Sequence, residues 1–443
     1  MEGSEQNADG DGDIQIGGDG VVAKDVSGSI VAGGDVNISV ADHKELAKEI
    51  MRHLSDLGLG PQSKLEDTAL SPEEEEGVDQ ALEGAEAAEE AGIDFDPWEY
   101  ITLGNAAGLR GRSSLAEGYF REALGLFDGG GGPRYSEAEK GKASALGSLG
   151  IIAVKRGKLT EAEGLIREAL DIFVQVGDRR GEGATLGNLG VISMSRGELD
   201  EAERLQKESL LIDREIGNLL GVGNSLGNLG IIANNRGDLG VAKERFEESL
   251  AIMREVGDRE GEAASLVALG AIAHKLKSLE EAEGLYKESL AIARENGDRQ
   301  GEADSLSNLG VVAISRGDLD EAERRFREAL AIDREVGSRR SQAKSITNLG
   351  RVADARGETE EADRMYKESL SVYREVGDRH GEADALANIG SIAHRLGDFK
   401  MAERYYRDHV RMANQIGVPM ADWFVNRGYT DPDAEWDFPP ESE

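Results

Sequence analysis

The sequence predicts an all-α protein, a solenoid of about eight helical hairpins with a short Gly- and Asp-rich β segment ahead of it. A glycine recurs every 40 residues, and an alanine stands 12 residues after each glycine. The glycines are Gly150, Gly190, Gly230, Gly270, Gly310, Gly350 and Gly390, and Gly104 marks an earlier, eighth copy. Because one hairpin cannot bury its apolar face alone, we expect the copies to stack.

Each copy is predicted to hold two helices. Around Gly310 the apolar side chains recur at helical spacing, at Leu306, Leu309, Val312 and Ala313 and then at Ala322, Phe326, Ala329 and Leu330. Gly317 breaks the first helix of this copy. Between copies, Gly257, Gly297 and Gly377 stand where a left-handed residue ends a helix, and the aspartate after each is expected to cap the next helix.

These positions resemble the tetratricopeptide repeat family, in which Gly, Ala, a large apolar residue and a small residue follow one another as Gly310, Ala322, Phe326 and Ala329 do. The period is longer than the family's usual spacing of about 34 residues. With its NLG and GDRxGEA runs, the chain is similar to the long-repeat branch of kinesin light chains and Leu-Gly-Asn-rich Pins-type adaptors. The resemblance covers residues 98–417 and implies a right-handed superhelix. Gln206 and His409 depart from the pattern.

The resemblance also implies where a ligand binds. In this family the first helix of each hairpin lines a concave groove, through the residues two before, one after, and four or five after the glycine. The position two before the glycine is an asparagine in five copies, at Asn188, Asn228, Asn308, Asn348 and Asn388. An amide can pair with the N–H and C=O of an extended peptide, as such ladders do in the family. Alternatively, each asparagine bonds a neighbouring helix and only sets the repeat spacing.

The remaining groove positions change in character along the array. They are apolar at Ile151, Val191, Ile231 and Val311, and polar or charged at Arg351, Ser391, His394 and Arg395. A ligand with an apolar stretch followed by a polar or charged one is therefore expected. The copy around Gly270 places His274 in the groove and Lys277 where the other copies have the inter-helix glycine. This copy is either a pocket for an apolar anchor or a copy that has drifted.

A second ladder lies six residues after the glycine, at Arg110, Arg156, Arg196, Arg236, Arg316 and Arg356, with Leu276 and Leu396 interrupting it. Arginines suit the carboxylates of a ligand. The position is also a helix C-terminus, where a cation complements the helix dipole, and we favour this second interpretation.

Composition excludes several functions. The formal charge is −36, of which about −20 falls in residues 1–97, so nucleic acid and anionic membranes are not expected partners. The chain has no cysteine, its six histidines show no metal-ligand spacing, and no Walker loop or catalytic constellation occurs, so we expect no enzyme, metal or cofactor. The sequence shows no signal peptide and no apolar stretch of membrane-spanning length, so a cytoplasmic location is expected.

Outside the repeats the chain divides into short segments. Residues 1–11 are predicted to be disordered, 12–41 to form short strands, 42–58 an amphipathic helix, and 59–97 an acidic linker that is helical in places. Residues 418–430 are predicted to cap the last hairpin, and 431–443 form an acidic tail. The helix exposes Leu46, Ile50, Leu54 and Leu57 on one face, either for self-association or for packing against the first repeat. The tail is either disordered, which we favour, or folds back through Trp436 and Phe438.

Together these features predict a non-catalytic protein–protein interaction scaffold that binds an extended peptide or protein segment in the concave groove. A homo-oligomer through residues 12–58 is expected. The alternative is a regulatory sensor subunit that controls a separate effector protein in signalling or defence.

Overall fold

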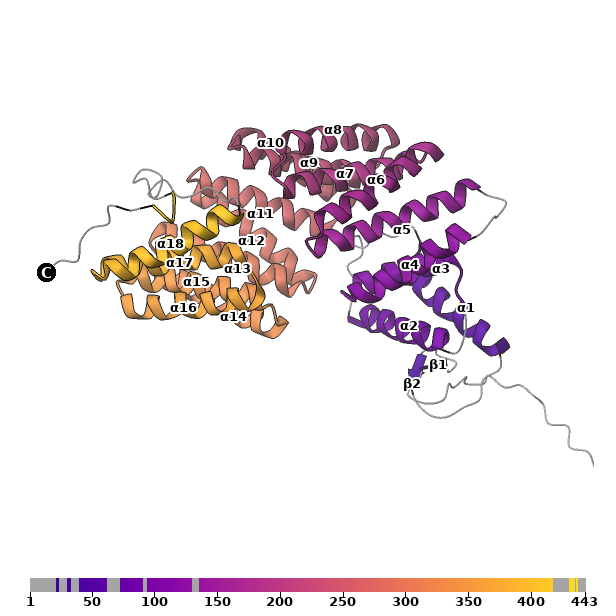
Figure 1. Ribbon diagram of the computed structural model, residues 1–443, viewed down its shortest axis with the longest axis horizontal. Helices are drawn as coiled ribbons and strands as arrows, with labels where there is room; N and C mark the ends of the chain where they lie inside the picture. Colours follow the sequence, from indigo (N-terminus) through magenta and orange to yellow (C-terminus); the bar gives the residue numbers. More distant parts are fainter. Residues whose placement is uncertain are drawn as a thin grey trace, which may run out of the picture. The chain divides into compact units, whose positions relative to one another are not determined.

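The computed structural model describes residues 21–23, 30–32, 40–61, 72–90, 94–129, 135–416, 430–434 and 436. These residues form 18 α-helices and two short strands (Figure 1). The chain divides into two compact units, Met1–Ile232 and Ala233–Glu443, which are described separately below. The prediction of an all-α repeat protein is confirmed.

Helices α3 to α18 are eight consecutive helix pairs that coincide with the eight predicted copies. The N-terminal unit contains α1 (Val40–Asp56), α2 (Pro72–Glu90), α3 (Pro97–Leu109), α4 (Ser113–Gly129), α5 (Tyr135–Lys155), α6 (Leu159–Val176), α7 (Arg179–Ser195) and α8 (Leu199–Ile216). The boundary between the units falls within α9 (Leu219–Asn235). The C-terminal unit contains α10 (Leu239–Val256), α11 (Arg259–Lys275), α12 (Leu279–Glu295), α13 (Arg299–Arg316), α14 (Leu319–Val336), α15 (Arg339–Arg356), α16 (Thr359–Val376), α17 (Arg379–Arg395) and α18 (Phe399–Ile416).

The predicted turn chemistry is present at the helix ends. Gly317, between α13 and α14, has φ +79°, and Gly377, between α16 and α17, has φ +71°, both in the left-handed region that favours glycine. Asp298 then caps α13, because its Oδ1 accepts the backbone N–H of Gly301 at 2.8 Å. Among the described residues, Lys277 is the only non-glycine with positive φ, at +65°. It therefore adopts the glycine conformation at some conformational cost.

The repeat glycines let the two helices of a hairpin approach closely. A Cβ atom added at Gly310 would lie 2.6 Å from Cε1 of Phe326, and one at Gly270 would lie 2.7 Å from Cε1 of Tyr286. The large ring on the second helix therefore fills the space that the missing side chain of the glycine leaves on the first helix. The apolar core continues from hairpin to hairpin, for example from Tyr286 through Leu306 to Ile332.

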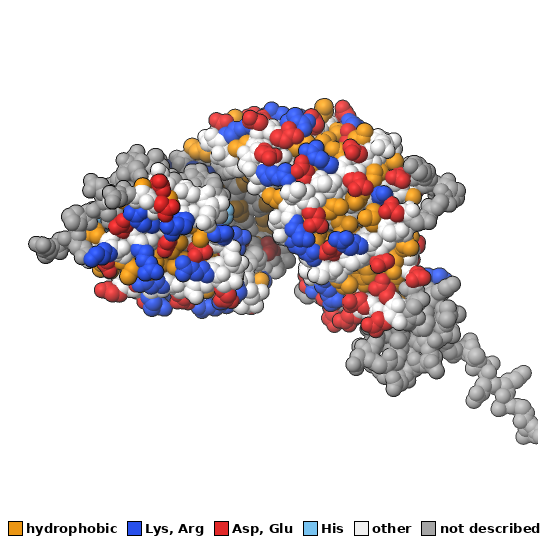
Figure 2. Space-filling model, in the orientation of Figure 1, with side chains coloured by type: hydrophobic (Ala, Val, Ile, Leu, Met, Phe, Trp, Pro, Cys, Tyr) orange, Lys and Arg blue, Asp and Glu red, His pale blue; other side chains and the backbone are white. Residues whose placement is uncertain are grey.

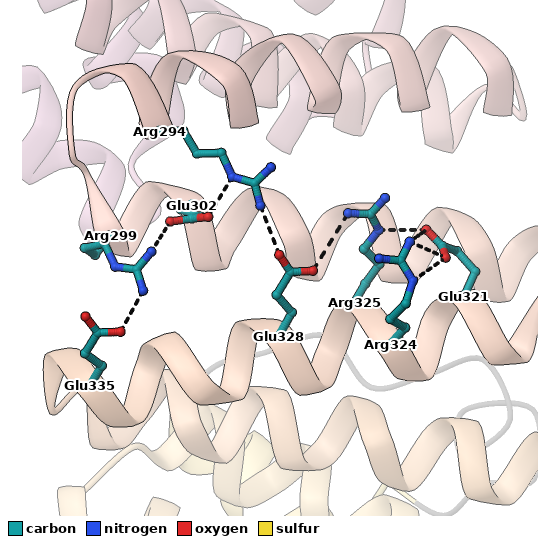
Figure 3. Close-up of polar contacts among 8 residues, drawn as sticks. All are labelled: Arg294, Arg299, Glu302, Glu321, Arg324, Arg325, Glu328 and Glu335. Carbon is teal, nitrogen blue, oxygen red and sulfur yellow. Dashed lines mark hydrogen bonds and ion pairs between the residues drawn. The ribbon is translucent and has the colours of Figure 1, made fainter.

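The GDRxGEA run joins successive hairpins through ion pairs (Figure 3). Nε of Arg294 on α12 donates to Oε1 of Glu302 on α13 at 2.7 Å, and its Nη2 donates to Glu328 on α14 at 2.9 Å. Arg299 pairs with the same Glu302 and reaches Glu335 at 2.6 Å. The set recurs one repeat earlier, with Arg254, Arg259, Glu262, Glu288 and Glu295 in the corresponding places. We call this arrangement the hairpin brace.

Two further helices precede the repeats. Ile50 and Leu54 of α1 are fully buried in one core with Val78 and Leu82 of α2 and with Ile101 of α3. Of the two sequence interpretations for residues 42–58, the structure shows packing against the first repeat. The apolar face is therefore used within the chain.

Residues 59–97 are predicted as an acidic linker that is helical in places, and within them α2 packs as part of the core. Its acids lie on one side, beginning with Glu73, Glu74 and Glu75 in the first turn, where they complement the helix dipole. In Figure 2 acidic side chains gather over this helix. The opposite side carries Val78, Ala81 and Leu82, all buried. Because α2 is rich in acids, its amphipathic pattern was not recognised from the sequence.

Of residues 12–41, the structure describes strands β1 (Val21–Ala23) and β2 (Ile30–Ala32), an antiparallel pair with Val22 opposite Val31, and the first residues of α1. Residues 1–11 and most of the predicted cap over 418–430 lie outside the described residues. At the C-terminal end, Trp436 packs against the core of the last hairpin beside Tyr406 and Val410. The favoured expectation of a disordered tail is wrong for residues 430–434 and 436.

Candidate peptide-binding surface

The candidate site lies on the first helix of each hairpin. In α13, Leu309 and Val312 are buried in the core, whereas Asn308, Val311 and Ile314 are half-buried. Val311 and Ile314 border the apolar core that contains Phe326, and the helical spacing places Asn308 on the side of α13 opposite Gly310. We call the side chains two before, one after, and four and five after each repeat glycine the first-helix surface.

Four of the predicted asparagines are available for a ligand. Asn188 on α7, Asn228 on α9, Asn308 on α13 and Asn388 on α17 are half-buried, and none of them forms a hydrogen bond with another described residue. Asn348 on α15 differs: it is 6 % exposed, and its Oδ1 accepts a hydrogen bond from Arg351 at 3.2 Å. Among the helices that the structure describes, no asparagine of the set bonds a neighbouring one.

Residues four and five after the glycine link adjacent first helices of the C-terminal unit. Lys275 Nζ donates to Asn234 Oδ1 at 2.8 Å, and His274 Nε2 lies 2.8 Å from Ser315 Oγ. Arg395 pairs with Asp354 through both Nη atoms. The predicted site residues His274 and Arg395 are therefore already engaged. The ring of His394 meets Phe399 edge-on at 5.3 Å.

Arg351 has a different environment from Arg395. It is exposed, it donates to Asn348, and it makes no ion pair with any described residue. Burial lowers the pKa of His274, and the positive charges of Lys277 and Arg351 lower it further. Lys277 and Arg351 therefore create a locally positive field around His274 in an acidic chain.

The arginine ladder holds hairpins together. Arg196 pairs with Glu163 of the preceding hairpin at 2.5 Å, Arg356 pairs with Glu323 at 2.6 Å, and Arg316 pairs with Glu283. Arg110 makes the equivalent bond to Asp79 on α2 at 2.8 Å and lowers the pKa of that carboxyl. Thus α2 supplies the carboxylate that the second helix of the preceding hairpin supplies for the other arginines.

Neither sequence interpretation of this ladder anticipated these pairs. The signal was a glutamate 33 residues before the arginine, visible only when two copies are aligned one repeat apart. Leu276 stands in place of the arginine in a copy that also lacks the partner glutamate. The residue 33 positions before it is Lys243, which binds Glu281 at 2.7 Å instead.

No other constellation in the described part of the chain points to chemistry. Within it, no group of three or more His, Asp or Glu side chains could hold a metal ion. No helix in the same residues is long and apolar enough to cross a membrane. Strongly shifted ionisable groups include tyrosines buried in hairpin cores, such as Tyr286, whose pKa burial raises to about 12.

Comparison with known proteins gives the family. The model of the tetratricopeptide repeat matches residues 141–215, 182–255, 261–335 and 341–415. Among curated proteins no significant match was found. Matching solved structures include the apo form of the quorum sensor NprR from B. thuringiensis, at 13 % identity over 84 % of this chain and 99 % of that chain, with a TM-score of 0.58.

Two further structures share this fold. A Rap protein complexed with competence and sporulation factor is 13 % identical over 84 % of this chain and 99 % of that chain, with a TM-score of 0.57. A STAND protein with a tetratricopeptide repeat sensor, from Pyrococcus horikoshii, is 16 % identical over 87 % of this chain and 54 % of that chain, with a TM-score of 0.54. Identities this low establish likeness of fold alone. Since the family model covers more than half of the sequence, the chain belongs to the tetratricopeptide repeat family.

Proposed function

We propose that this protein is a non-catalytic scaffold that binds an extended peptide or protein segment along the first-helix surface. The observation that carries the proposal is the set of half-buried asparagines whose amides make no bond within the described chain. Each amide offers a donor and an acceptor at the same place in its repeat, in successive repeats at Asn188 and Asn228 and two repeats apart at Asn308 and Asn388. An extended main chain, which alternates N–H and C=O groups, is the ligand that such a row fits best.

The side chains around the asparagines favour an amphipathic ligand. In the N-terminal unit, the residue after the repeat glycine is Ile151, Val191 or Ile231, each partly or largely exposed. In the C-terminal unit the same position is still apolar at Ala271 and Val311, and it becomes polar at Arg351 and Ser391 in the last two hairpins. The charge of Arg351 also lowers the pKa of His274. Apolar ligand residues therefore suit the hairpins of Gly150 to Gly310, and an acidic one suits Arg351.

The second candidate function is a regulatory sensor that acts on a separate effector protein. The observation that favours it is that the solved structures with this fold include a quorum sensor, a Rap protein with a bound signalling factor, and a STAND protein whose repeats are called a sensor. Binding along the first-helix surface serves both functions. They differ in whether the bound ligand changes the affinity for a second protein.

The test is selection of ligands by the full chain from a library of random dodecapeptides, followed by titration of the best binders. Asn308→Ala with Asn388→Ala should weaken binding by about 5- to 150-fold, because each amide contributes about 0.5–1.5 kcal/mol through neutral hydrogen bonds. Asn296→Ala is the matched control, since Asn296 is exposed at the end of α12, off the first-helix surface. Equal affinity for the double variant, the control and the parent would exclude the asparagines as ligand contacts.

A further inference from the structure

The outer surface of α18 corresponds to the face on which the next hairpin packs elsewhere in the array. In the internal hairpins, an arginine near the end of the second helix donates to a glutamate of the following first helix. Arg254 bonds Glu262, Arg294 bonds Glu302 and Arg374 bonds Glu382, each through Nε. The corresponding residue of α18 is Asn414, which donates to the backbone oxygen of Thr430 at 3.1 Å.

The C-terminal segment makes several other bonds to this surface. Nη1 of Arg407 donates to the carbonyl oxygens of Pro432 at 2.6 Å and Ala434 at 2.8 Å. The guanidinium carbon of Arg407 lies 4.5 Å from the ring centroid of Trp436, a cation–π contact. The Trp436 ring packs on the core formed by Ala393, Ala402, Tyr406 and Val410, while its indole N–H donates to the carbonyl of Asp431 at 2.7 Å.

Charge complementarity supports the same pairing. Helix α18 carries Lys400, Arg404, Arg407 and Arg411 against Glu403 and Asp408, an excess of base in a chain with a formal charge of −36. The segment from residue 430 onward carries acids and no Lys or Arg. Arg411 Nη2 lies 3.3 Å from Oδ1 of Asp433. A basic helix thus faces an acidic segment in a protein whose surface charge otherwise disfavours such a segment.

We propose that the outer surface of α18 is a docking site for an acidic, tryptophan-bearing segment, and that the chain's own residues 430–434 and 436 occupy it in cis. The bound segment replaces the missing next hairpin with three elements: carbonyl groups for Arg407, an indole for the apolar core, and a carbonyl for Asn414. This site lies on a second helix, so it is distinct from the first-helix surface and does not depend on the peptide-binding proposal.

The cis arrangement predicts competition. A short connection holds the segment near its site at an effective concentration in the millimolar range, so a free segment of the same sequence binds poorly while the site is filled. Removal of the segment should open the site to the same sequence added in trans.

The probe is a fluorescein-labelled peptide of residues 430–443, titrated by anisotropy against a chain of residues 1–429 and against the full chain. We expect saturable binding to the shortened chain and at least tenfold weaker binding to the full chain. A peptide with Trp436→Ala and a scrambled peptide of equal charge should each bind at least tenfold more weakly than the native peptide. In the shortened chain, Arg407→Ala should weaken binding, whereas Arg404→Ala, an exposed change on the same helix, should not.

Equal binding of the native and scrambled peptides, or equal binding to the full and shortened chains, would overturn the proposal. Absence of binding to a shortened chain that retains the helical circular dichroism of the parent would do the same. Should the shortened chain fail to fold, the full chain still tests the idea. With Trp98→Phe and Trp423→Phe, Trp436 is the sole tryptophan. Arg407→Ala should then raise its quenching by acrylamide at least twofold, and Arg404→Ala should leave it unchanged; equal quenching in both would exclude the docked segment.

Discussion

Close packing against the second helix requires glycine near the centre of each first helix. Two glycines of the C-terminal unit allow this requirement to be distinguished from the effect of helix propensity. Gly310→Ala places a Cβ 2.6 Å from the Phe326 ring and should lower the free energy of unfolding by about 1–3 kcal/mol. Gly284→Ala on α12 meets nothing within 4 Å and should raise it by about 0.5–1 kcal/mol. Urea denaturation followed by circular dichroism measures both variants. Effects of the same sign would show that close approach does not decide the residue type.

Asp333 on α14 supplies a test of pH dependence. It is 2 % exposed, Ser345 Oγ donates to its Oδ2 at 2.8 Å, and its Oδ1 has no partner among the described residues. Burial raises its pKa, while the Ser345 hydrogen bond opposes that shift only in part. A carboxyl whose pKa is raised in the folded state contributes stability below its ordinary pKa, and this stability is lost as the pH rises through the raised value.

Replacing Asp333 with Asn should therefore stabilise the protein relative to the parent progressively as the pH rises from about 4 towards neutrality. The measurement is the urea midpoint of both proteins between pH 4 and pH 8. Asp171→Asn, an exposed change on α6, serves as the control. Parallel pH profiles for the parent and Asp333→Asn would mean that the buried carboxyl does not titrate differently in the folded chain.

Single residues that break the repeat pattern were harder to interpret from sequence than those that keep it. Gln206 and His409 stand where apolar or small residues are usual, and both are buried. Gln206 Nε2 donates to the carbonyl of Gly187 at 2.8 Å, and the His409 ring lies 2.8 Å from the carbonyl of Ala383. The backbone partner comes from the other helix of the hairpin, and sequence spacing does not show it. The five asparagines were found because their type and position recur.

At the scale of the element, the hairpin brace makes one glutamate more important than its neighbours. The Glu302 side chain is 8 % exposed and bonds both Arg294 and Arg299, whereas Glu321 on α14 pairs with arginines of its own helix at the surface (Figure 3). Glu302→Ala should cost about 1–2 kcal/mol, because it removes bonds to two half-exposed arginines. Glu321→Ala should cost less than about 0.5 kcal/mol. Thermal melts of both variants at low and high salt compare the two sites, and equal losses would argue against the brace.

The elements that sequence predicted well are those whose signals repeat. Eight copies of a glycine-alanine spacing fix both helices of every hairpin, and Asp178, Asp258, Asp298 and Asp378 cap the helices that follow left-handed glycines. Helix α2 and the docked segment at Trp436 each occur once, and both are acidic. Acidic composition suggests a solvated linker or tail unless the apolar residues are counted by face. The partners that order these two segments, such as Arg110 for α2 and Arg407 for the segment, lie on helices that precede or follow them.

At the scale of the whole molecule, the repeats and the flanking segments serve different purposes. In a stacked array each hairpin touches only its neighbours, so stability is close to a sum of local contributions. The ion-paired arginines and the brace strengthen these contributions between hairpins. Asn188, Asn228, Asn308 and Asn388 of the first-helix surface form no hydrogen bond with another described residue. That division explains how one repeated sequence can provide both a stable array and a surface open to a ligand.

The last prediction concerns self-association of the whole molecule. The sequence assigns it to residues 12–58, and the structure limits the residues that can mediate it. Burial of Ile50 and Leu54 inside the chain removes the apolar face of α1, so residues 12–39 alone should carry pairing between copies. Light scattering after size exclusion should find the full chain oligomeric and a chain starting at Val40 monomeric, with equal melting temperatures. A chain starting at Asp96 serves as a comparison. It lacks α1 and α2, so Ile101 and its apolar neighbours become exposed, and this chain should aggregate. Equal masses for the full chain and the Val40 chain would show that residues 12–39 do not join copies of the protein.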